Sequence, residues 1–232
     1  MTERAEAIAD RVCELRARIA EAAARAGRDP DDVGVVAVTK KQPPDVVAAA
    51  REAGLVHVGE NYVQELLQKR DALGDPSDLR WHFVGKLQRN KAKFLAGGVE
   101  LVHALDSESA ARALSTRAAA AGLVQPVLAA VNVGGEAQKS GVSPSALSDF
   151  LSVLGELPGV RCDGLMTMPP QGDDAEASRR YFRALRELRD RHQRPDRPLT
   201  QLSMGTTGDF EVAVEEGATW VRVGTAVLGE RP

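Results

Sequence analysis

The sequence predicts an α/β protein of a single domain, a (β/α)8 or TIM barrel. Three observations lead to this prediction. Short apolar segments alternate with amphipathic segments along the whole chain, which is typical of a parallel sheet covered by helices. The apolar segments lack strict apolar–polar alternation, as strands buried on both faces do. Eight such segments occur within 232 residues, slightly below the roughly 250 residues typical of this fold.

The first element is an amphipathic helix over residues 2–27. Ile8, Val12, Leu15 and Ile19 recur at spacings of three and four, so they lie on one helix face. Thr2 can cap the start of this helix, and a glycine closes it. The chain stops soon after the eighth predicted strand, so we expect no eighth helix there. We expect the N-terminal helix to pack on the barrel in its place.

The strands and helices that follow alternate without interruption. The predicted strands cover residues 35–39, 55–60, 80–85, 100–106, 126–133, 161–168, 199–205 and 219–229. The predicted helices between them cover residues 45–54, 61–74, 87–98, 107–122, 143–159, 174–192 and 208–217. Pro43 and Pro44 suit the start of the first of these helices, and Gly54 its end.

A doubly wound sheet is the competing architecture. It usually has fewer strands, and no G-x-G-x-x-G motif follows the first predicted strand. No linker rich in proline, glycine or serine divides the chain. We therefore expect one domain over residues 1–232.

Composition excludes several classes of protein. The chain is 43% hydrophobic and 27% charged with a formal net charge of −3, which is ordinary for a globular protein. A general nucleic-acid binder would carry a basic excess. No apolar run has membrane-spanning length, and the N-terminus lacks the apolar region of a signal peptide. Cys13 and Cys162 lie far apart and form no C-x-x-C motif, so we expect a cytoplasmic protein without a disulfide framework.

Functional groups of a barrel gather where its strands end. The stretch "SMGTTGDF" after the seventh strand is small, hydroxylated and rich in glycine, and "RVGT" ends the eighth. Such a turn exposes backbone N–H groups at a helix start, which suits a phosphate. The alternative is an ordinary turn with Asp209 or Thr207 as helix cap. The position after strands seven and eight favours the phosphate site.

The first strand ends on Lys40 and Lys41. A lysine at a strand end is most often solvated. Within a barrel mouth, desolvation and nearby cations lower a lysine's pKa, and a neutral amine can form a Schiff base. Opposite a phosphate site, its partner would be pyridoxal phosphate (PLP) or the phosphosugar of an aldolase. The two lysines point to opposite faces of a strand that is apolar on both, so the pattern leaves both open.

Several longer motifs resemble a known family. The stretches "AVTK", "GENYVQE", "WHFVGKLQRNK", "NVGGEAQKSG", "GLMTM", "LSMG" and "VRVGTAVLG" resemble the YggS/PROSC family of PLP-binding homeostasis proteins. The resemblance covers the chain from about Val33 to Pro232. That family's fold is similar to the N-terminal barrel domain of alanine racemase.

The resemblance implies a set of cofactor-binding residues. Lys40 matches the lysine that holds PLP as an aldimine, and Arg222 matches an arginine near the pyridine nitrogen. Asn61 and Met166 match residues that line the pocket. The matching phosphate cup comprises Ser203, Gly205, Thr206, Thr207, Gly224 and Thr225. Many members have Met-Ser where this chain has Thr206 and Thr207, so a hydroxyl is kept at the serine position.

Other residues that match the family motifs have no assigned role. Their loops are expected around the pocket mouth; they are Gln88, Asn90, Lys91, Glu136 and Lys139. The histidines lack metal-ligand spacing, so we expect no metal site. His57, His82 and His103 lie within predicted strands and are expected to be core or barrel residues.

Two functional classes remain. The resemblance favours a protein that holds PLP and takes part in intracellular PLP homeostasis without substrate turnover. Its expected partners are PLP and apo PLP-dependent enzymes as recipients, with no nucleic acid or membrane, and we expect a monomer. The alternative is a PLP-dependent amino-acid racemase or decarboxylase.

Racemisation needs two opposed acid–base groups. In alanine racemases the second is a tyrosine from another domain, and this chain has only Tyr62 and Tyr181. A Schiff-base aldolase acting on a phosphosugar is a weaker third hypothesis.

Overall fold

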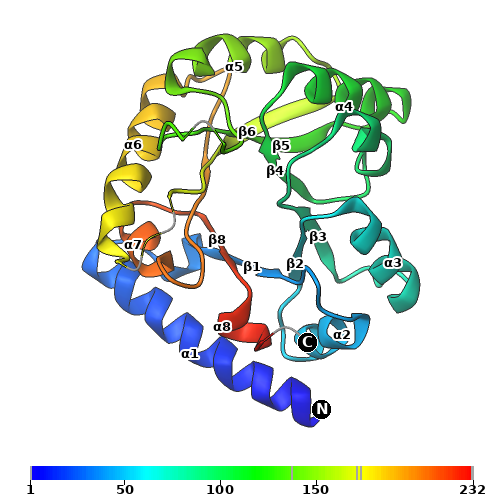
Figure 1. The fold of residues 1–232 in the computed structure, drawn as a ribbon, viewed down its shortest axis with the longest axis vertical. Coiled ribbons are helices and arrows are strands. Elements are labelled where there is room, and N and C mark those ends of the chain that lie inside the picture. The colour runs from blue at the N-terminus through cyan, green and yellow to red at the C-terminus, as the bar shows by residue number, and fades with distance from the viewer. Residues whose placement is uncertain (1, 137, 171, 173, 231–232) are drawn as a thin grey trace.

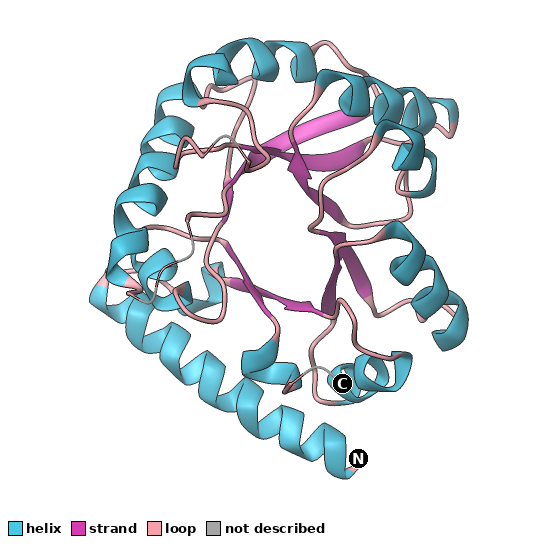
Figure 2. Cartoon of the chain, viewed as in Figure 1, coloured by secondary structure: helices cyan, strands magenta, loops and turns pink. Residues whose placement is uncertain are grey.

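Eight parallel strands form a closed barrel, and helices cover its outside (Figure 1; Figure 2). The computed structural model describes residues 2–136, 138–170, 172 and 174–230. The strands follow one another around the barrel in chain order, and the eighth pairs with the first. The predicted fold is therefore confirmed. Residue 1 and residues 231–232 of the predicted domain lie outside the described residues.

All eight strands overlap the segments predicted for them. They are β1 (Gly34–Val38), β2 (His57–Glu60), β3 (Arg80–Phe83), β4 (Leu101–Leu105), β5 (Gln125–Ala130), β6 (Val160–Met166), β7 (Gln201–Ser203) and β8 (Trp220–Val223). Every residue of β4 is buried, as expected for a strand enclosed on both faces.

The helices pack around this barrel (Figure 2). The α-helices are α1 (Glu3–Arg25), α2 (Pro44–Glu52), α3 (Val63–Leu73), α4 (Glu108–Ala120), α5 (Leu147–Gly155), α6 (Glu176–His192), α7 (Phe210–Glu215) and α8 (Thr225–Leu228). Three short 3-10 helices are η1 (Pro30–Asp32), η2 (Arg89–Phe94) and η3 (Pro144–Ala146).

The segment 87–98 differs from the prediction of an α-helix. Within it only residues 89–94 are helical, as the 3-10 helix η2, and the preceding residue Gln88 makes no side-chain cap. Ala92 is buried within η2, and Leu95, the residue that follows η2, is also buried. Gly97, with φ 69°, then stops any continuation.

The predicted strand 219–229 is also shorter than expected. β8 ends at Val223, and the carbonyl of Gly224 accepts hydrogen bonds from the backbone N–H groups of Val227 (3.1 Å) and Leu228 (2.9 Å). These bonds form the single turn α8. The expectation that no eighth helix follows is therefore corrected: a one-turn helix follows the last strand.

Helix α1 lies along the outside of the barrel and contacts α7, α8 and α2 (Figure 1). Its start is capped by the Thr2 hydroxyl, which accepts a hydrogen bond from the Ala5 N–H. The apolar face predicted from the sequence is buried. The short α8 leaves room on this side of the barrel, which α1 occupies.

Apolar side chains form two separate layers. The larger lies between the helices and the outside of the barrel. The smaller fills part of the barrel interior with Leu101, Ala104, Leu128, Ala130 and Met166, against which Trp220 packs. A barrel interior is commonly filled by large branched residues. The two alanines leave space at the carboxyl ends of the strands.

We predict that Leu15→Ala lowers the free energy of unfolding by about 2–5 kcal/mol, the range for truncating a buried leucine. Leu15 is only 3% exposed on the inner face of α1. Urea unfolding followed by circular dichroism measures the change. The exposed neighbour Glu14 provides the control, because Glu14→Ala should leave the midpoint unchanged. Equal midpoints for the two variants would show that α1 adds little to barrel stability.

Candidate functional site

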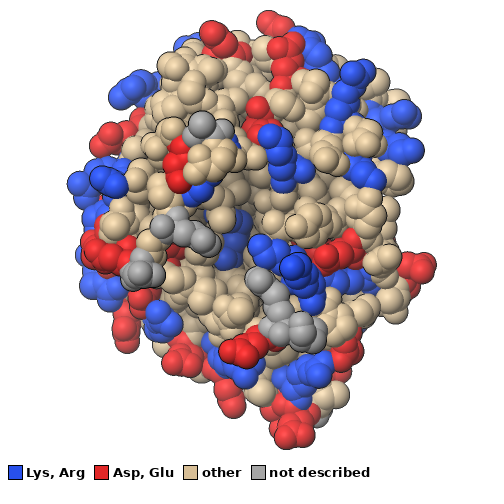
Figure 3. Space-filling model, in the orientation of Figure 1, with Lys and Arg blue, Asp and Glu red and all other residues tan. Residues whose placement is uncertain are grey.

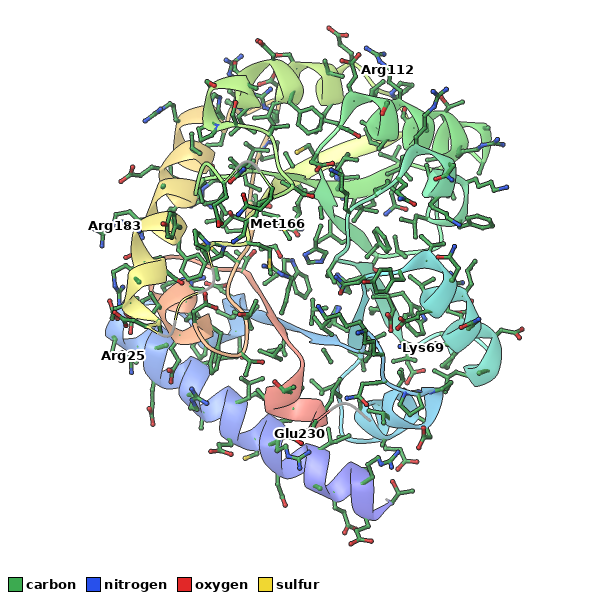
Figure 4. All side chains as sticks on the ribbon, in the orientation of Figure 1. Arg25, Lys69, Arg112, Met166, Arg183 and Glu230 are labelled. Atoms are coloured by element: carbon green, nitrogen blue, oxygen red, sulfur yellow. The ribbon has the colours of Figure 1, made fainter. Side chains whose placement is uncertain are left out.

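A cavity of about 930 Å³ lies at the carboxyl ends of the strands. It is lined by residues that end or follow β1, β2, β3, β4, β5, β6, β7 and β8. Figure 3 shows Lys and Arg side chains around the centre of the molecule in the view down the barrel. Met166, labelled in Figure 4, lies inside the ring of strands.

Most of the predicted site residues line this one cavity. They are Lys40, Asn61, Met166, Thr206, Thr207, Arg222, Gly224 and Thr225. They come from four regions of the sequence, after β1, after β2, at the end of β6, and around the ends of β7 and β8. The closed barrel brings these regions together.

The structure separates the two lysines that the strand pattern left open. Lys40 is half-buried and lines the cavity. Lys41 is exposed with φ 60°, and its backbone N–H donates to Glu65 Oε2 at 2.7 Å. Only Lys40 of the pair therefore lines the cavity.

A buried ion pair supports the backbone behind Lys40. Lys69 Nζ donates to Glu60 Oε1 at 2.5 Å and to the Thr39 carbonyl at 2.7 Å. The Thr39 hydroxyl donates to the same carboxylate oxygen. Burial raises the pKa of Glu60, while the hydrogen bond from Lys69 opposes that rise. This network ties the end of β1 to the end of β2, the two segments that carry Lys40 and Asn61.

Sequence reasoning missed Lys69, which Figure 4 labels on α3. The signal was present: Lys69 lies three residues after Leu66 and six after Val63, on the buried side of the helix. A lysine in an apolar stripe needs a buried partner, because unpaired burial of its charge is costly.

The loop between β7 and α7 forms one wall of the cavity. Gly205 has φ 90°, and a Cβ there would lie 2.6 Å from the Cβ of Ala213. The Thr206 N–H and hydroxyl both donate to Asp209 Oδ1, at 2.7 Å and 3.0 Å. The Gly224 N–H donates to the Thr207 hydroxyl at 3.4 Å, which joins this loop to the end of β8. The loop therefore holds hydroxyl and N–H groups in a fixed wall.

Arg222 forms part of the cavity floor. Its side chain is buried, and burial lowers its pKa to about 10. The guanidinium donates to the Ser203 hydroxyl at 2.5 Å and to the Thr167 carbonyl at 2.9 Å. Among the described residues, no carboxylate forms an ion pair with it. The cavity floor therefore carries a buried cation, and the charge of Asp209 raises the pKa of Arg222 against the effect of burial.

Two predicted members of the phosphate cup do not line the cavity. Ser203 is fully buried, and its hydroxyl contacts Arg222 and His103 instead of the open space. Gly205 is buried behind the loop that it shapes. The strand–turn pattern placed both near the cup but could not show which face of β7 they occupy.

The five residues without an assigned role lie in different places. Lys139 lines the cavity and forms an ion pair with Glu136 at 2.7 Å. Gln88 and Asn90 line a second hollow of about 880 Å³, outside the barrel between η2 and α4. Lys91 lies over the ring of Phe94. Of these five residues, Lys139 lines the cavity and Glu136 contacts Lys139, while the other three do not line it.

Asn61 has an incomplete hydrogen-bond set. Its side-chain oxygen is buried and has no hydrogen-bond partner within the described part of the chain. A buried polar atom without a partner is unusual and costly. Because Asn61 also lines the cavity, a polar ligand there can satisfy it. The described residues include no group of acidic, histidine or cysteine side chains that could hold a metal ion.

Comparison with known proteins places this geometry in a family. The sequence matches the family described as alanine racemase, N-terminal domain, over residues 12–232. A pyridoxal phosphate homeostasis protein of Aquifex aeolicus is 48% identical over 223 residues, covering 96% of this chain and 97% of the relative. The protein of that name from Pseudomonas aeruginosa is 42% identical, covering 97% and 96%.

The chain belongs to the pyridoxal phosphate homeostasis protein family.

Solved structures of this family agree with the fold. PipY of Synechococcus elongatus without PLP has a TM-score of 0.85 at 36% identity, covering 96% of this chain and all of PipY. PipY with PLP bound has a TM-score of 0.82 at 35% identity, with the same coverage. Alanine racemase of Corynebacterium glutamicum has a TM-score of 0.68 at 17% identity, which shows the shared barrel alone. The chain spans 62% of that racemase.

We predict that Lys69→Met lowers the free energy of unfolding by about 3–5 kcal/mol, because it leaves the buried Glu60 carboxylate without its cation. Both side chains are almost fully buried, at 5% and 0% exposure. Urea unfolding measures the loss. The double variant Lys69→Met/Glu60→Gln should recover most of it, since the uncompensated charge is gone. A double variant as unstable as the single one would contradict this account of the pair.

Proposed function

We propose that this protein binds PLP covalently through Lys40 and carries it without converting a substrate. The observation that carries the proposal is that Lys40 shares one cavity with the threonine and glycine loops after β7 and β8. In this proposal the Lys40 amine and the hydroxyl-rich loops bind opposite ends of one ligand. PipY, a relative with PLP in its structure, supports this choice over the phosphosugar of an aldolase.

Each part of the cavity has a chemical task in this proposal. Lys40 would supply the amine that bonds covalently to the aldehyde carbon of PLP, with loss of water. Thr207 and Thr225 donate hydroxyl hydrogen bonds to the phosphate, and Gly224 positions Thr207 through its N–H. PLP supplies an aldehyde and an electron-withdrawing ring when bound. Arg222, a cation, disfavours protonation of the pyridine nitrogen, so the ring withdraws electrons weakly.

The positions of the two tyrosines support a protein that carries PLP without converting a substrate. Tyr62 is 54% exposed, and within the described residues neither it nor Tyr181 lines the cavity. The cavity therefore lacks a tyrosine that could act as a second acid–base group opposite Lys40.

We propose a monomeric cytoplasmic carrier whose recipients are apo PLP-dependent enzymes. Its two unpaired cysteines, Cys13 and Cys162, are typical of a reducing compartment. No helix in the described part of the chain has the length and apolarity needed to cross a membrane.

We predict that Lys40→Ala abolishes covalent PLP binding, while Lys41→Ala leaves it intact. Lys41 is the matched control, because it is the adjacent lysine but lies outside the cavity. The measurement is borohydride reduction of protein mixed with PLP, followed by peptide mass mapping. The expected result is a pyridoxyl-phosphate adduct on Lys40. An unchanged visible absorbance band in Lys40→Ala, or an adduct only on Lys41, would overturn the assignment.

We predict that Thr207→Val weakens PLP binding by about tenfold, the effect of losing one hydrogen bond to a charged group. Affinity for pyridoxal, which lacks the phosphate, should change little. Titration of both compounds measures this difference. Thr116→Val on the exposed face of α4 is the control and should affect neither. An equal loss for PLP and pyridoxal would show that Thr207 shapes the cavity without contacting phosphate.

A further inference from the structure

Three histidines form a continuous hydrogen-bonded chain inside the barrel. His57 Nδ1 lies 2.9 Å from His82 Nε2, and His82 Nδ1 lies 2.9 Å from His103 Nε2. His103 Nδ1 then lies 2.7 Å from the Ser203 hydroxyl, which contacts Arg222. The histidines were expected to be core or barrel residues; the structure shows that they bond to one another.

The hydrogen-bonded chain of histidines runs through the barrel interior toward the cavity. His57 is the first residue of β2 and is half-buried. His82 pairs in register with Gly59, two residues further along β2, and with Leu101, two residues before His103 on β4. Each step therefore rises by two residues toward the carboxyl ends. His82 and His103 are fully buried, so solvent can reach the chain only at His57.

The need of the Ser203 proton for an acceptor sets the direction of the hydrogen bonds in the chain. A guanidinium only donates, so the Ser203 oxygen accepts from it. Among the described contacts of Ser203, His103 Nδ1 is the one acceptor for its proton. His103 must then carry its proton on Nε2 and donate to His82, and His82 must do the same toward His57. All three rings are thereby fixed as the Nε2–H form.

Burial keeps the rings neutral. Desolvation lowers the pKa of His82 to about 3 and also lowers those of His57 and His103. Trp220 covers the chain, with its ring centroid 5.0 Å from those of His57 and His82. All hydrogen bonds in this neutral chain therefore point the same way. The Ser203 oxygen is the acceptor at one end, and the Nε2–H of His57 is the donor at the other.

We propose that His57, His82 and His103 are positioning residues that act through Ser203 to hold Arg222 in place and to stabilise its charge. Aligned hydrogen bonds strengthen one another in a low-dielectric interior. The chain thus presents a partial negative end to a buried cation that has no carboxylate partner within the described residues. A carboxylate would neutralise the charge, whereas neutral imidazoles leave it available to a ligand in the cavity.

The direction of the chain rests on its hydrogen bonds and the neutrality of its rings rests on their burial, whereas its effect on PLP rests on the proposed function. The first experiment therefore uses full-length protein without cofactor. Histidine ¹⁵N labelling with long-range ¹H–¹⁵N correlation reports the tautomer and charge of each ring. We expect three neutral Nε2–H rings at neutral pH, while His192 at the end of α6 serves as the internal reference outside the chain. An Nδ1–H ring or an imidazolium within the chain would overturn the proposal.

A second experiment tests whether the chain acts on Arg222. His57→Phe removes the last acceptor at the half-buried end, and His57→Gln restores a carbonyl acceptor there. His57→Phe should shift the side-chain signals of His103 and Arg222, and His57→Gln should return them toward wild type. Unchanged signals in His57→Phe would show that the histidines merely fill space. The matched control is His192→Phe, which should leave both signals unchanged.

With PLP added, His103→Phe should lower affinity by about tenfold and shift the absorbance maximum of the bound cofactor, because Ser203 no longer holds Arg222. His103→Gln should restore the maximum, because it can accept from Ser203 and donate to His82. If the wild-type protein binds no PLP, the proposed function fails. The cofactor-free spectra still show whether the histidine chain has the proposed direction and charge. If His103→Phe does not fold, the comparison of His57→Phe with His57→Gln tests the proposal without it.

Discussion

The buried cation of Arg222 is the constraint around which the polar half of the barrel is arranged. Taking a guanidinium out of water costs several kcal/mol unless its donors find acceptors. The Thr167 carbonyl follows β6, the Ser203 hydroxyl ends β7, and Arg222 itself lies on β8. In register, Met166 pairs with Ser203, and Ser203 with Trp220. A one-residue slip of β7 would turn the Ser203 hydroxyl to the other face of the strand and remove one acceptor of the Arg222 charge.

The alternation of apolar and amphipathic segments was sufficient to predict the barrel, because each strand is a local pattern repeated eight times. It was not sufficient for the segment after β3, where only residues 89–94 are helical and form a 3-10 helix. It also failed after Val223, since Gly224 ends the strand within an apolar run that has no other break. After Val223 a glycine therefore follows the strand end, against the hydrophobic pattern.

The site was predictable where sequence position alone fixes a residue and unpredictable where strand facing matters. Thr206, Thr207 and Arg222 follow from their positions at strand ends. Only the resemblance to the family distinguished Lys40 from Lys41. The alternation of side chains along a strand cannot decide between two neighbouring residues when both faces of the strand are apolar. Ser203 required the side-chain direction on β7. The histidine chain required the stagger between neighbouring strands, which no single segment encodes.

The cavity is supported on two sides by buried polar networks that do not share a residue. Lys69 and Glu60 brace the end of β1, beside Lys40. Ser203 and the histidines brace Arg222 from β7, β4, β3 and β2. An apolar core would be as stable with less risk of an unpaired group, so such networks are expected where function requires them. One network fixes the group proposed to bond PLP, and the other fixes the charge proposed to make its ring a weak electron sink. Together they are consistent with the proposed role of holding PLP without converting a substrate.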